Sequence, residues 1–280
     1  MDLEQYREVS LNIWNTVAGG WGRERELVWE GSRAAGEDMV ASLDPSPGDS
    51  VLELAAGAGD TGFLAAAAIG DEGRLLSTDF STAMVDEARA NATRLGLTNV
   101  DFRVLDAEDM DLADDSFDGV LCKYGYMLMA DPAAALAETR RVLKPGARLS
   151  FSVWGDPERN PWVTVPMRTL VEFADIPPPE PGAPGVLAMA DHDRIRELVK
   201  GAGFADPEIA EISVNWPIYD LESFHRFIEE LAGPIKLTLD SLSDEQRAQT
   251  WEELDRQIAP FLEDREGFEG ICNNVVAESV

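Results

Sequence analysis

A glycine-rich loop directly after a short apolar run constrains the fold of this 280-residue chain more than any other feature. Val51–Leu54 reads as a buried strand, and Gly57, Gly59 and Gly62 follow at the spacing G-x-G-x-x-G. Glycine at such positions permits a sharp backbone turn and the close approach of a ligand. The apolar residues after Gly62 predict a helix. A strand, a glycine loop and a helix N-terminus are typical of nucleotide sites, although a plain turn is the alternative for the loop alone.

Strand-like and helix-like segments alternate beyond this loop. Ser81 suits the N-cap of one helix and Gly96 its C-cap. The alternation favours a doubly wound, mostly parallel sheet. Strands are expected at Leu75–Asp79, Val100–Leu105, Phe117–Cys122 and Arg148–Trp154, and helices at Ser81–Leu95 and Asp131–Leu143.

The two ends of the chain differ from this core. Residues 1–46 read as helical with a break at Gly19-Gly20, and the proline-rich run 176–185 reads as a stiff surface loop. We therefore expect a helical lid segment at 1–46, a core at 47–154, and further strands with helical insertions at about 155–190 and 217–268 within 155–280. The expected elements after the core are helices at Asp191–Ala202, Leu221–Leu231 and Asp244–Leu262, and strands at Glu208–Trp216 and Ile271–Glu278.

The net charge of −30, from 53 acidic and 23 basic residues, narrows the choice of partners. Such a chain repels nucleic acid and anionic membranes. The acidic surface either attracts cationic ligands or is simply solvated, as in adaptation to salt. No run of eighteen apolar residues is present, the N-terminus is acidic, and the two cysteines lie in apolar runs. We expect a cytoplasmic protein without a membrane span, a disulfide framework or a metal site.

Several motifs follow one another in the order of a known family. Glu53 precedes the loop as E-x-x-x-G-x-G, Asp79 ends the next strand, and Asp106-Ala107-Glu108 follows the third. Ser116–Leu121 and Arg141–Gly146 complete the set. The chain resembles the class I S-adenosylmethionine-dependent methyltransferases, and within them the ubiquinone/menaquinone-biosynthesis-type branch. The resemblance implies a Rossmann-like, doubly wound α/β fold with a mostly parallel seven-stranded sheet and helical lid insertions.

The same resemblance implies S-adenosylmethionine as cofactor. Backbone groups of Gly57 and Gly59 would reach its amino-acid end, Asp79 its ribose hydroxyls and Asp106 its adenine. Taken singly, Asp79 also suits a helix N-cap, Asp106 a turn, and Cys122 a small buried residue. The expected cofactor-binding residues are Glu53, Ala55, Gly57, Gly59, Thr61, Asp79, Phe80, Met84, Asp106, Ala107, Cys122 and Lys123.

The implied activity is in-line methyl transfer to a small, apolar or aromatic organic acceptor. A general base is needed only if the acceptor keeps its proton. His225, on a helix inserted between the last two strands, and Tyr124, after the fourth strand, are the candidate catalytic residues. The alternative for His225 is an exposed helix face, and for Tyr124 packing in a core or lid. Aromatic and methionine side chains suggest an apolar acceptor pocket or, alternatively, a core for the lid helices; they are Tyr6, Trp14, Trp21, Tyr126, Met127, Met129, Trp154, Trp162 and Met167.

Two other functions remain open from the sequence. The glycine loop also matches the fingerprint of NAD(P)-dependent oxidoreductases, but Glu53 and Asp60 crowd negative charge where a pyrophosphate would lie. A catalytically silent S-adenosylmethionine-binding protein would carry the same motifs and differ only in forming no methylated product. The expected partner is a small-molecule acceptor, with a homodimer left open, and neither nucleic acid nor membrane is expected.

Overall fold

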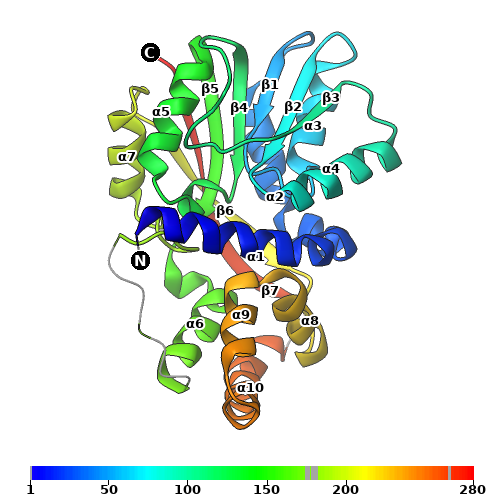
Figure 1. Ribbon diagram of the computed structural model, residues 1–280, viewed down its shortest axis with the longest axis vertical. Helices are drawn as coiled ribbons and strands as arrows, with labels where there is room; N and C mark the ends of the chain where they lie inside the picture. The colour runs from blue at the N-terminus through cyan, green and yellow to red at the C-terminus, as the bar shows by residue number, and fades with distance from the viewer. Residues whose placement is uncertain (1, 174–176, 178–181, 264–265) are drawn as a thin grey trace.

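The computed structural model describes residues 2–173, 177, 182–263 and 266–280 of the chain. Within this part, seven strands form a single sheet in the order β3-β2-β1-β4-β5-β7-β6 (Figure 1). The strands are β1 Ser50–Glu53, β2 Arg74–Asp79, β3 Val100–Val104, β4 Phe117–Lys123, β5 Leu143–Trp154, β6 Glu208–Trp216 and β7 Phe268–Glu278.

The sheet is mostly parallel, as expected for a doubly wound fold. β1 lies in its centre, where Val51 is in register with Leu75 of β2 on one side and Gly119 of β4 on the other. β7 runs antiparallel to both of its neighbours, inserted between β5 and β6. The order reverses between β1 and β4, and the crevice at such a reversal is where ligands bind in open α/β sheets. The predicted seven-stranded, Rossmann-like fold is confirmed.

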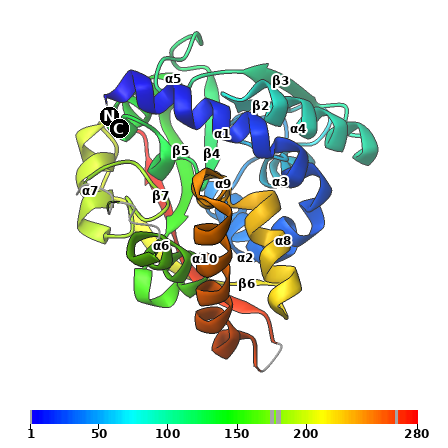
Figure 2. The same ribbon diagram turned by 60° about the horizontal axis from the view of Figure 1, so that its bottom comes forward.

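Helices cover both faces of the sheet. Successive strand residues point to opposite faces, and Val51 belongs to a buried cluster with residues of α2, α3 and α4, while Leu52 belongs to a cluster that includes residues of α5 and α7. The remaining helices gather beyond the strand ends (Figure 2). The longer helices are α1 Leu3–Arg23, α2 Arg25–Leu43, α3 Asp60–Ile69, α4 Thr82–Leu95, α5 Pro132–Val142, α6 Pro161–Phe173, α7 His192–Gly201, α8 Leu221–Leu231, α9 Gly233–Ser241 and α10 Asp244–Ile258.

The expected helix break at Gly19-Gly20 is wrong. Helix α1 continues through both glycines to Arg23, and the chain turns at Glu24. A Cβ at position 20 would collide with the carbonyl oxygen of Glu230 in α8. Glycine at this position therefore serves close helix packing rather than a change of direction. The helix expected after Gly62 begins earlier, at Asp60.

Several helix and strand boundaries agree with those expected from capping residues and apolar runs in the sequence. Ser81 caps α4 by accepting a hydrogen bond from the Met84 N–H, and Gly96 ends the helix in the left-handed region. β6 and α8 have the expected bounds. β5 begins at Leu143, directly after α5, so the strand includes the Lys144-Pro145-Gly146 segment that was expected to precede it. α6 and α9 were not delimited by the sequence pattern, and most of the proline-rich run 176–185 lies outside the described residues.

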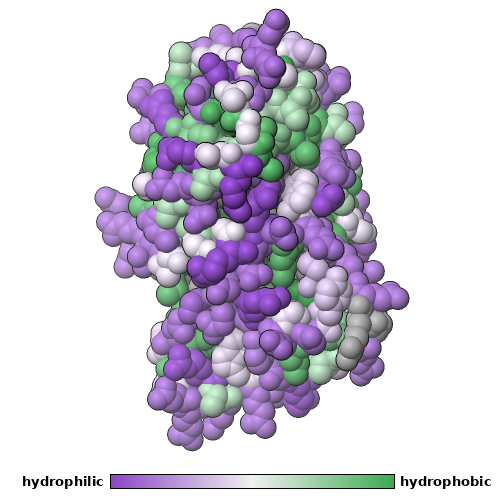
Figure 3. Space-filling model, turned by 90° about the vertical axis from the view of Figure 1, so that its right-hand side faces the viewer, coloured by the Kyte–Doolittle hydropathy of each residue, from purple (hydrophilic) through white to green (hydrophobic). Residues whose placement is uncertain are grey.

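The surface reflects the charge of the chain. Hydrophilic residues cover most of the face seen in Figure 3, with hydrophobic patches mainly toward its upper end. Among the described helices, none is both long and apolar enough to cross a bilayer.

Candidate functional site

A cavity of about 740 Å³ lies at the carboxyl ends of the parallel strands. Its floor is formed by the loops that follow β1, β2, β3 and β4, and α1 crosses over it between the sheet and the lower helices (Figure 1). We call the lining residues at 53–60, 79–84, 105–108 and 123 the polar half. We call Tyr124 and the lining residues that follow it in the chain the aromatic half.

Glu53 organises the glycine loop from beneath. Its carboxylate accepts hydrogen bonds from the Gly62 N–H at 2.6 Å and from the Ser77 hydroxyl at 2.8 Å, and the side chain is buried. Burial raises the pKa of Glu53 to about 8, against the opposing effect of its hydrogen bonds and of Lys123. A Cβ on Gly62 would occupy the space of this carboxylate. The last glycine of the motif is therefore required by Glu53.

The first glycine of the motif leaves room for a ligand, whereas a Cβ on Gly59 would collide with the Phe63 ring. Gly57 and Gly59 adopt φ values of +54° and +90°, which favour glycine. A Cβ at position 57 would project where the nearest atoms belong to the Trp21 ring, 3.8 Å away. A ligand can therefore lie directly against the loop backbone. This open cradle fits the amino-acid end of S-adenosylmethionine.

Asp79, at the end of β2, is fixed by the same loop. Its carboxylate accepts hydrogen bonds from the Gly57 N–H at 3.1 Å and the Ser81 N–H at 2.9 Å. Burial raises the pKa of Asp79 to about 6. The N-cap of α4 is Ser81. Asp79 therefore does not cap this helix, which was the alternative role that the sequence offered for it. Its carboxylate lines the polar half beside Phe80, where it can accept hydroxyl hydrogen bonds.

Asp106 and Glu108 follow β3 and differ in role. Asp106 accepts a hydrogen bond from the Glu108 N–H and lies 3.6 Å from Arg7 of α1, with its side chain partly exposed. The Glu108 carboxylate accepts from the backbone N–H groups of Ala130 and Asp131. Glu108 therefore holds two loops together, while Asp106 stays accessible to a ligand.

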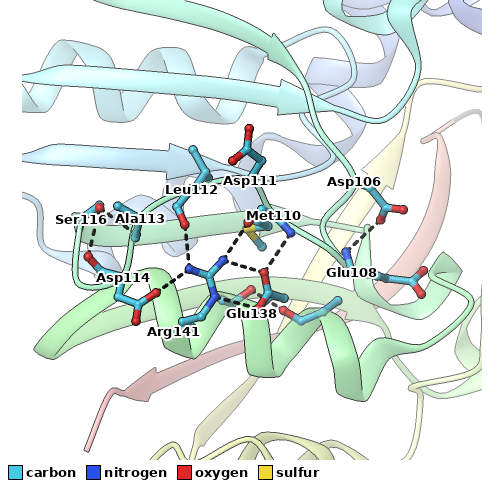
Figure 4. A network of polar contacts seen from close by, with 12 residues as sticks. Asp106, Glu108, Met110, Asp111, Leu112, Ala113, Asp114, Ser116, Glu138 and Arg141 are labelled. Atoms are coloured by element: carbon cyan, nitrogen blue, oxygen red, sulfur yellow. Dashed lines mark hydrogen bonds and ion pairs between the residues drawn. The ribbon is translucent and has the colours of Figure 1, made fainter.

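Arg141 of α5 holds the loop that carries these residues (Figure 4). Its guanidinium donates to the carbonyls of Met110 and Leu112 and to the carboxylates of Asp114 and Glu138, at 2.7–2.8 Å. These interactions attach the loop between β3 and β4 to α5. The motif around Arg141 thus shapes the site without lining it.

Lys123 ends β4 at the boundary of the two halves. Its ammonium donates to the Ser32 hydroxyl at 2.8 Å and lies 5.5 Å from the centre of the Trp29 ring. Burial lowers its pKa, while Asp60 and Glu53 act in the opposite direction. The cation partly compensates the carboxylates of the polar half.

Helix α1 is attached to both sides of the cavity. The Tyr6 hydroxyl donates to the Leu128 carbonyl at 3.0 Å, and the Trp21 indole N–H donates to the Leu231 carbonyl at 3.3 Å. Arg7 pairs with Glu108. The two helices of the expected N-terminal lid segment therefore have different places. Helix α1 covers the cavity, and helix α2 packs on the sheet.

Rings form the wall of the aromatic half. Trp154 ends β5, Trp162 lies in α6, Trp216 ends β6 and Phe227 lies in α8. Ring centroids are 4.6 Å apart for Trp154 and Trp162, and 5.3 Å for Trp216 and Phe227. Among the described lining residues after Tyr124 there is no acidic or basic side chain. The aromatic half is thus an uncharged chamber in a strongly acidic chain.

Tyr124 contributes its ring rather than its hydroxyl. The backbone has a φ of +57°, and the ring stacks on Trp154 at 4.2 Å between centroids. The hydroxyl is buried without a well-formed hydrogen bond, beside the Cys272 thiol and the Ser152 hydroxyl. Burial raises its pKa well above 10. This hydroxyl is a poor proton acceptor at neutral pH.

His225 lies outside the cavity. It projects from α8 onto α10, where its Nε2 is 2.5 Å from the Asp255 carboxylate and its ring 4.5 Å from that of Trp251. The expectation that His225 lines the pocket is therefore corrected, because its helix presents Phe227 to the cavity instead. Of the other expected residues, Thr61 and Cys122 are buried behind the wall, and burial raises the pKa of Cys122 to about 12. The expected residues that line the cavity are Glu53, Ala55, Gly57, Gly59, Asp79, Phe80, Met84, Asp106, Ala107, Lys123 and Tyr124.

Sequence reasoning missed Arg7, Ser32, Trp216 and Phe227, which also line the cavity. Trp216 had a usable signal, because it is the last residue of an expected strand and parallel strands place their carboxyl ends at one edge of the sheet. Arg7, Ser32 and Phe227 lie on helices whose facing residues depend on the packing of distant segments.

Known proteins share this arrangement. A family model described as a methyltransferase domain matches residues 45–159. A demethylmenaquinone methyltransferase from Renibacterium salmoninarum is 30% identical over 201 residues, which cover 69% of this chain and 79% of that protein. An aklanonic acid methyltransferase from Streptomyces is 34% identical over 117 residues, or 42% of this chain and 53% of that protein. The crystal structure of a SAM dependent methyltransferase from Aquifex aeolicus has a TM-score of 0.55 at 17% identity, covering 92% of this chain and 98% of that one, and shows the same fold.

The extent of these matches varies. The chain spans only about half the length of several curated relatives, 57% of one and 53% of another. The match to the Renibacterium protein extends over most of both chains. Together with the glycine cradle and the ordered motifs after β1, β2 and β3, it identifies the family. The chain belongs to the class I S-adenosylmethionine-dependent methyltransferases, in their ubiquinone/menaquinone-biosynthesis-type branch.

Proposed function

We propose that this protein transfers a methyl group from S-adenosylmethionine to a small apolar or aromatic acceptor, leaving S-adenosylhomocysteine. The observation that carries the proposal is the continuous cavity, in which the glycine loop and the aromatic half share one space. A cofactor held by the polar half and an acceptor held by the aromatic half would meet at its boundary, near Lys123 and Tyr124. Methyl transfer requires this end-to-end placement more than it requires a catalytic dyad.

The polar half supports the cofactor assignment. The backbone of Gly57 and Gly59 would hold the amino-acid end, the Asp79 carboxylate the ribose, and Asp106 with the Ala107 backbone the adenine. The carboxylates of Asp60 and Asp79 provide a negative environment that suits a cation, whereas Glu53, with a pKa of about 8, is largely protonated at neutral pH. When bound, S-adenosylmethionine supplies a methyl group activated by its sulfonium.

The names of two relatives support a ring-containing acceptor. One is a demethylmenaquinone methyltransferase and the other an aklanonic acid methyltransferase. The rings of Trp154, Trp162 and Trp216 offer flat apolar surface to such a molecule. We therefore assign the acceptor to the aromatic or quinone-type class. The charge of −30 supports a small molecule over a nucleic acid.

The chain's own contribution is binding, orientation and exclusion of water. Helix α1 and the insertions at about 155–190 and 217–268 act in this proposal as the cover over the acceptor. Tyr124 positions the acceptor with its ring, since its buried hydroxyl does not exchange protons readily. Without a base in the described aromatic half, the acceptor has to be nucleophilic at working pH.

Titration calorimetry with S-adenosylmethionine, S-adenosylhomocysteine and NADH tests the cofactor. We expect micromolar binding of the two sulfur nucleotides and none of NADH. Incubation with S-adenosylmethionine and a panel of naphthoquinols and phenols then tests turnover, read as S-adenosylhomocysteine formation. Binding without a product on any acceptor would favour a catalytically silent binder, and binding of NADH alone would contradict the proposal.

A further inference from the structure

Lys123 is one of two basic residues among the described residues that line the cavity, the other being Arg7. Arg7 belongs to α1 and already pairs with the Glu108 carboxylate. Lys123 ends β4 directly before Tyr124, the first residue of the aromatic half. Under the proposed function, its positive charge therefore lies where cofactor and acceptor meet.

The ammonium of Lys123 is bordered by residues of the aromatic half and of α2. It donates to the Ser32 hydroxyl at 2.8 Å and lies 5.8 Å from the centre of the Tyr124 ring. Gly31, next to Ser32 in α2, packs against the ring of Trp216, which belongs to the wall of the aromatic half. Lys123 is partly exposed, and Ser32 lines the cavity with it. The cavity therefore reaches the charged end of this side chain and not only its stem.

The charge of Lys123 has no counter-ion of its own. The carboxyl groups that act on it belong to Asp60 of α3 and Glu53 of β1. The Asp60 carboxylate already accepts from the Arg25 guanidinium. Glu53, with a pKa of about 8, is largely protonated at neutral pH. The third titratable group that acts on Lys123 is the Cys272 thiol of β7, and burial raises the pKa of this thiol and keeps it neutral.

The hydrogen bonds of this ammonium are also incomplete. An ammonium has three N–H donors, and among the described residues the Ser32 hydroxyl is the only hydrogen-bond partner. The rings of Trp29 and Tyr124 lie 5.5 Å and 5.8 Å from it and add only a weaker attraction. Burial of a cation without a counter-ion is unfavourable, and here it lowers the pKa of Lys123. An anionic ligand atom would supply both the missing charge and the missing acceptor.

We infer that Lys123 holds the methyl acceptor as an oxyanion, with its ammonium against the ionised oxygen of a weakly acidic hydroxyl such as a phenol or an enol. The inference rests on the proposed function, which assigns the acceptor to the space beside Tyr124. It adds the ionisation state of the acceptor and the residue that stabilises it. The hydroxyl proton passes to water, and an electron pair of the anion forms the bond to the methyl carbon as the carbon–sulfur bond breaks toward sulfur. Lys123 thus makes the acceptor nucleophilic at working pH without a general base.

The carboxylate of the cofactor is the competing anion for Lys123. S-adenosylhomocysteine carries this carboxylate, and 5′-methylthioadenosine lacks the whole amino-acid end. We expect Lys123→Met to change the calorimetric dissociation constants of both nucleotides by no more than about threefold. A larger loss of affinity confined to S-adenosylhomocysteine would assign Lys123 to the cofactor and overturn the inference.

The direct test uses 4-nitrophenol as a probe, because its phenolate absorbs visible light and the neutral phenol does not. The pKa of the bound probe is measured by absorbance on the whole protein saturated with S-adenosylhomocysteine, whose sulfur is uncharged. In the wild type this pKa should lie about one unit below that of the free probe, which gives about tenfold more phenolate at a given pH.

Lys123→Met should raise the pKa of the bound probe above its value in free solution, since burial then acts without a cation. Lys123→Arg keeps the charge and should retain most of the lowering. Lys200→Met is the matched control, because Lys200 is exposed on α7 with its ammonium 3.4 Å from Asp206. This variant should behave as the wild type.

One outcome overturns the inference without any variant: a wild-type protein that binds no probe, or that leaves its pKa at or above the value in free solution. A lowered pKa that survives in Lys123→Met overturns it as well. Failure of the proposed function would look different. S-adenosylhomocysteine would not bind, or no acceptor would be methylated, while the pKa of the bound probe would still depend on Lys123.

Discussion

The polar and aromatic halves of the cavity are built in different ways. In the polar half, Glu53 and Asp79 each accept hydrogen bonds from N–H groups of the glycine loop or its neighbours, and both lie within a few residues of a strand end. In the aromatic half, Trp216 comes from a segment far along the chain from Trp154 and Trp162, and the three side chains touch mainly through their rings. The first half depends on local backbone geometry and the second on tertiary packing.

This contrast bears on what each half can recognise. Fixed carboxylates around a glycine cradle select one ligand by hydrogen bonds of defined direction. Packed rings accept related flat molecules and discriminate weakly between them. Under the proposed function, a specific cofactor site would thus adjoin an acceptor chamber of broader tolerance.

The strictest test of the polar half is Gly62→Ala. The added methyl group would displace the buried Glu53 carboxylate, so we expect the free energy of unfolding to fall by about 4 kcal/mol. Urea denaturation measures this change. Gly201→Ala, at the end of α7, adds a methyl group with no neighbouring atom within 4 Å and should change stability by less than about 1 kcal/mol. Equal stability of the two variants would show that Glu53 does not support the loop.

The second test concerns ligand binding by Asp79. Asp79→Ala removes the acceptor of the Gly57 N–H and the carboxylate offered to the ribose, so the affinity for S-adenosylhomocysteine should fall about 100-fold. Calorimetry measures the loss. Asp101→Ala, on the neighbouring strand with an exposed carboxylate 3.6 Å from Arg74, should leave affinity within twofold. If both variants bind alike, the polar half does not recognise the ligand through fixed carboxylates.

The third test uses pH. The folded pKa of Glu53, about 8, lies above its ordinary value of 4.5, so the protonated carboxyl stabilises the fold. This contribution is complete below pH 4.5 and is lost as the pH rises through about 8. We expect the ligand-free protein to be about 2 kcal/mol less stable at pH 8 than at pH 6. Glu53→Gln should remove most of this dependence in urea denaturation. If the stability of the Glu53→Gln variant still falls between pH 6 and pH 8, the pH dependence comes from other groups.

The same contrast explains what the sequence could predict. The strands, the glycine loop and Asp79 were predictable because their signals lie within a few residues of each other. The expected helix break at Gly19-Gly20 was wrong because a glycine pair can mark either a helix break or a close helix contact, and the sequence does not distinguish the two. Phe227 was missed because the chamber exists only after α6, α8 and β6 have packed together, whereas Trp216 could have been found from its place at the end of an expected strand.

The smallest expected effect concerns His225, the residue for which sequence reasoning and structure differ most. Its ring contacts Asp255 and Trp251 on α10 and lies outside the cavity in the described part of the chain. His225→Ala should lower the free energy of unfolding by about 1 kcal/mol through loss of a partly exposed hydrogen bond and a ring contact. Once an acceptor is found, the rate of methyl transfer should stay within twofold of the wild type.

Asp255→Asn is the matched variant, because it weakens the same contact from α10 and leaves His225 in place. Both variants should lose a similar, small amount of stability, with kcat and KM unchanged. A tenfold fall in kcat for His225→Ala alone would mean that α8 turns this histidine into the chamber when ligands bind. The aromatic half would then contain a base, and its contrast with the polar half would hold only for the ligand-free protein.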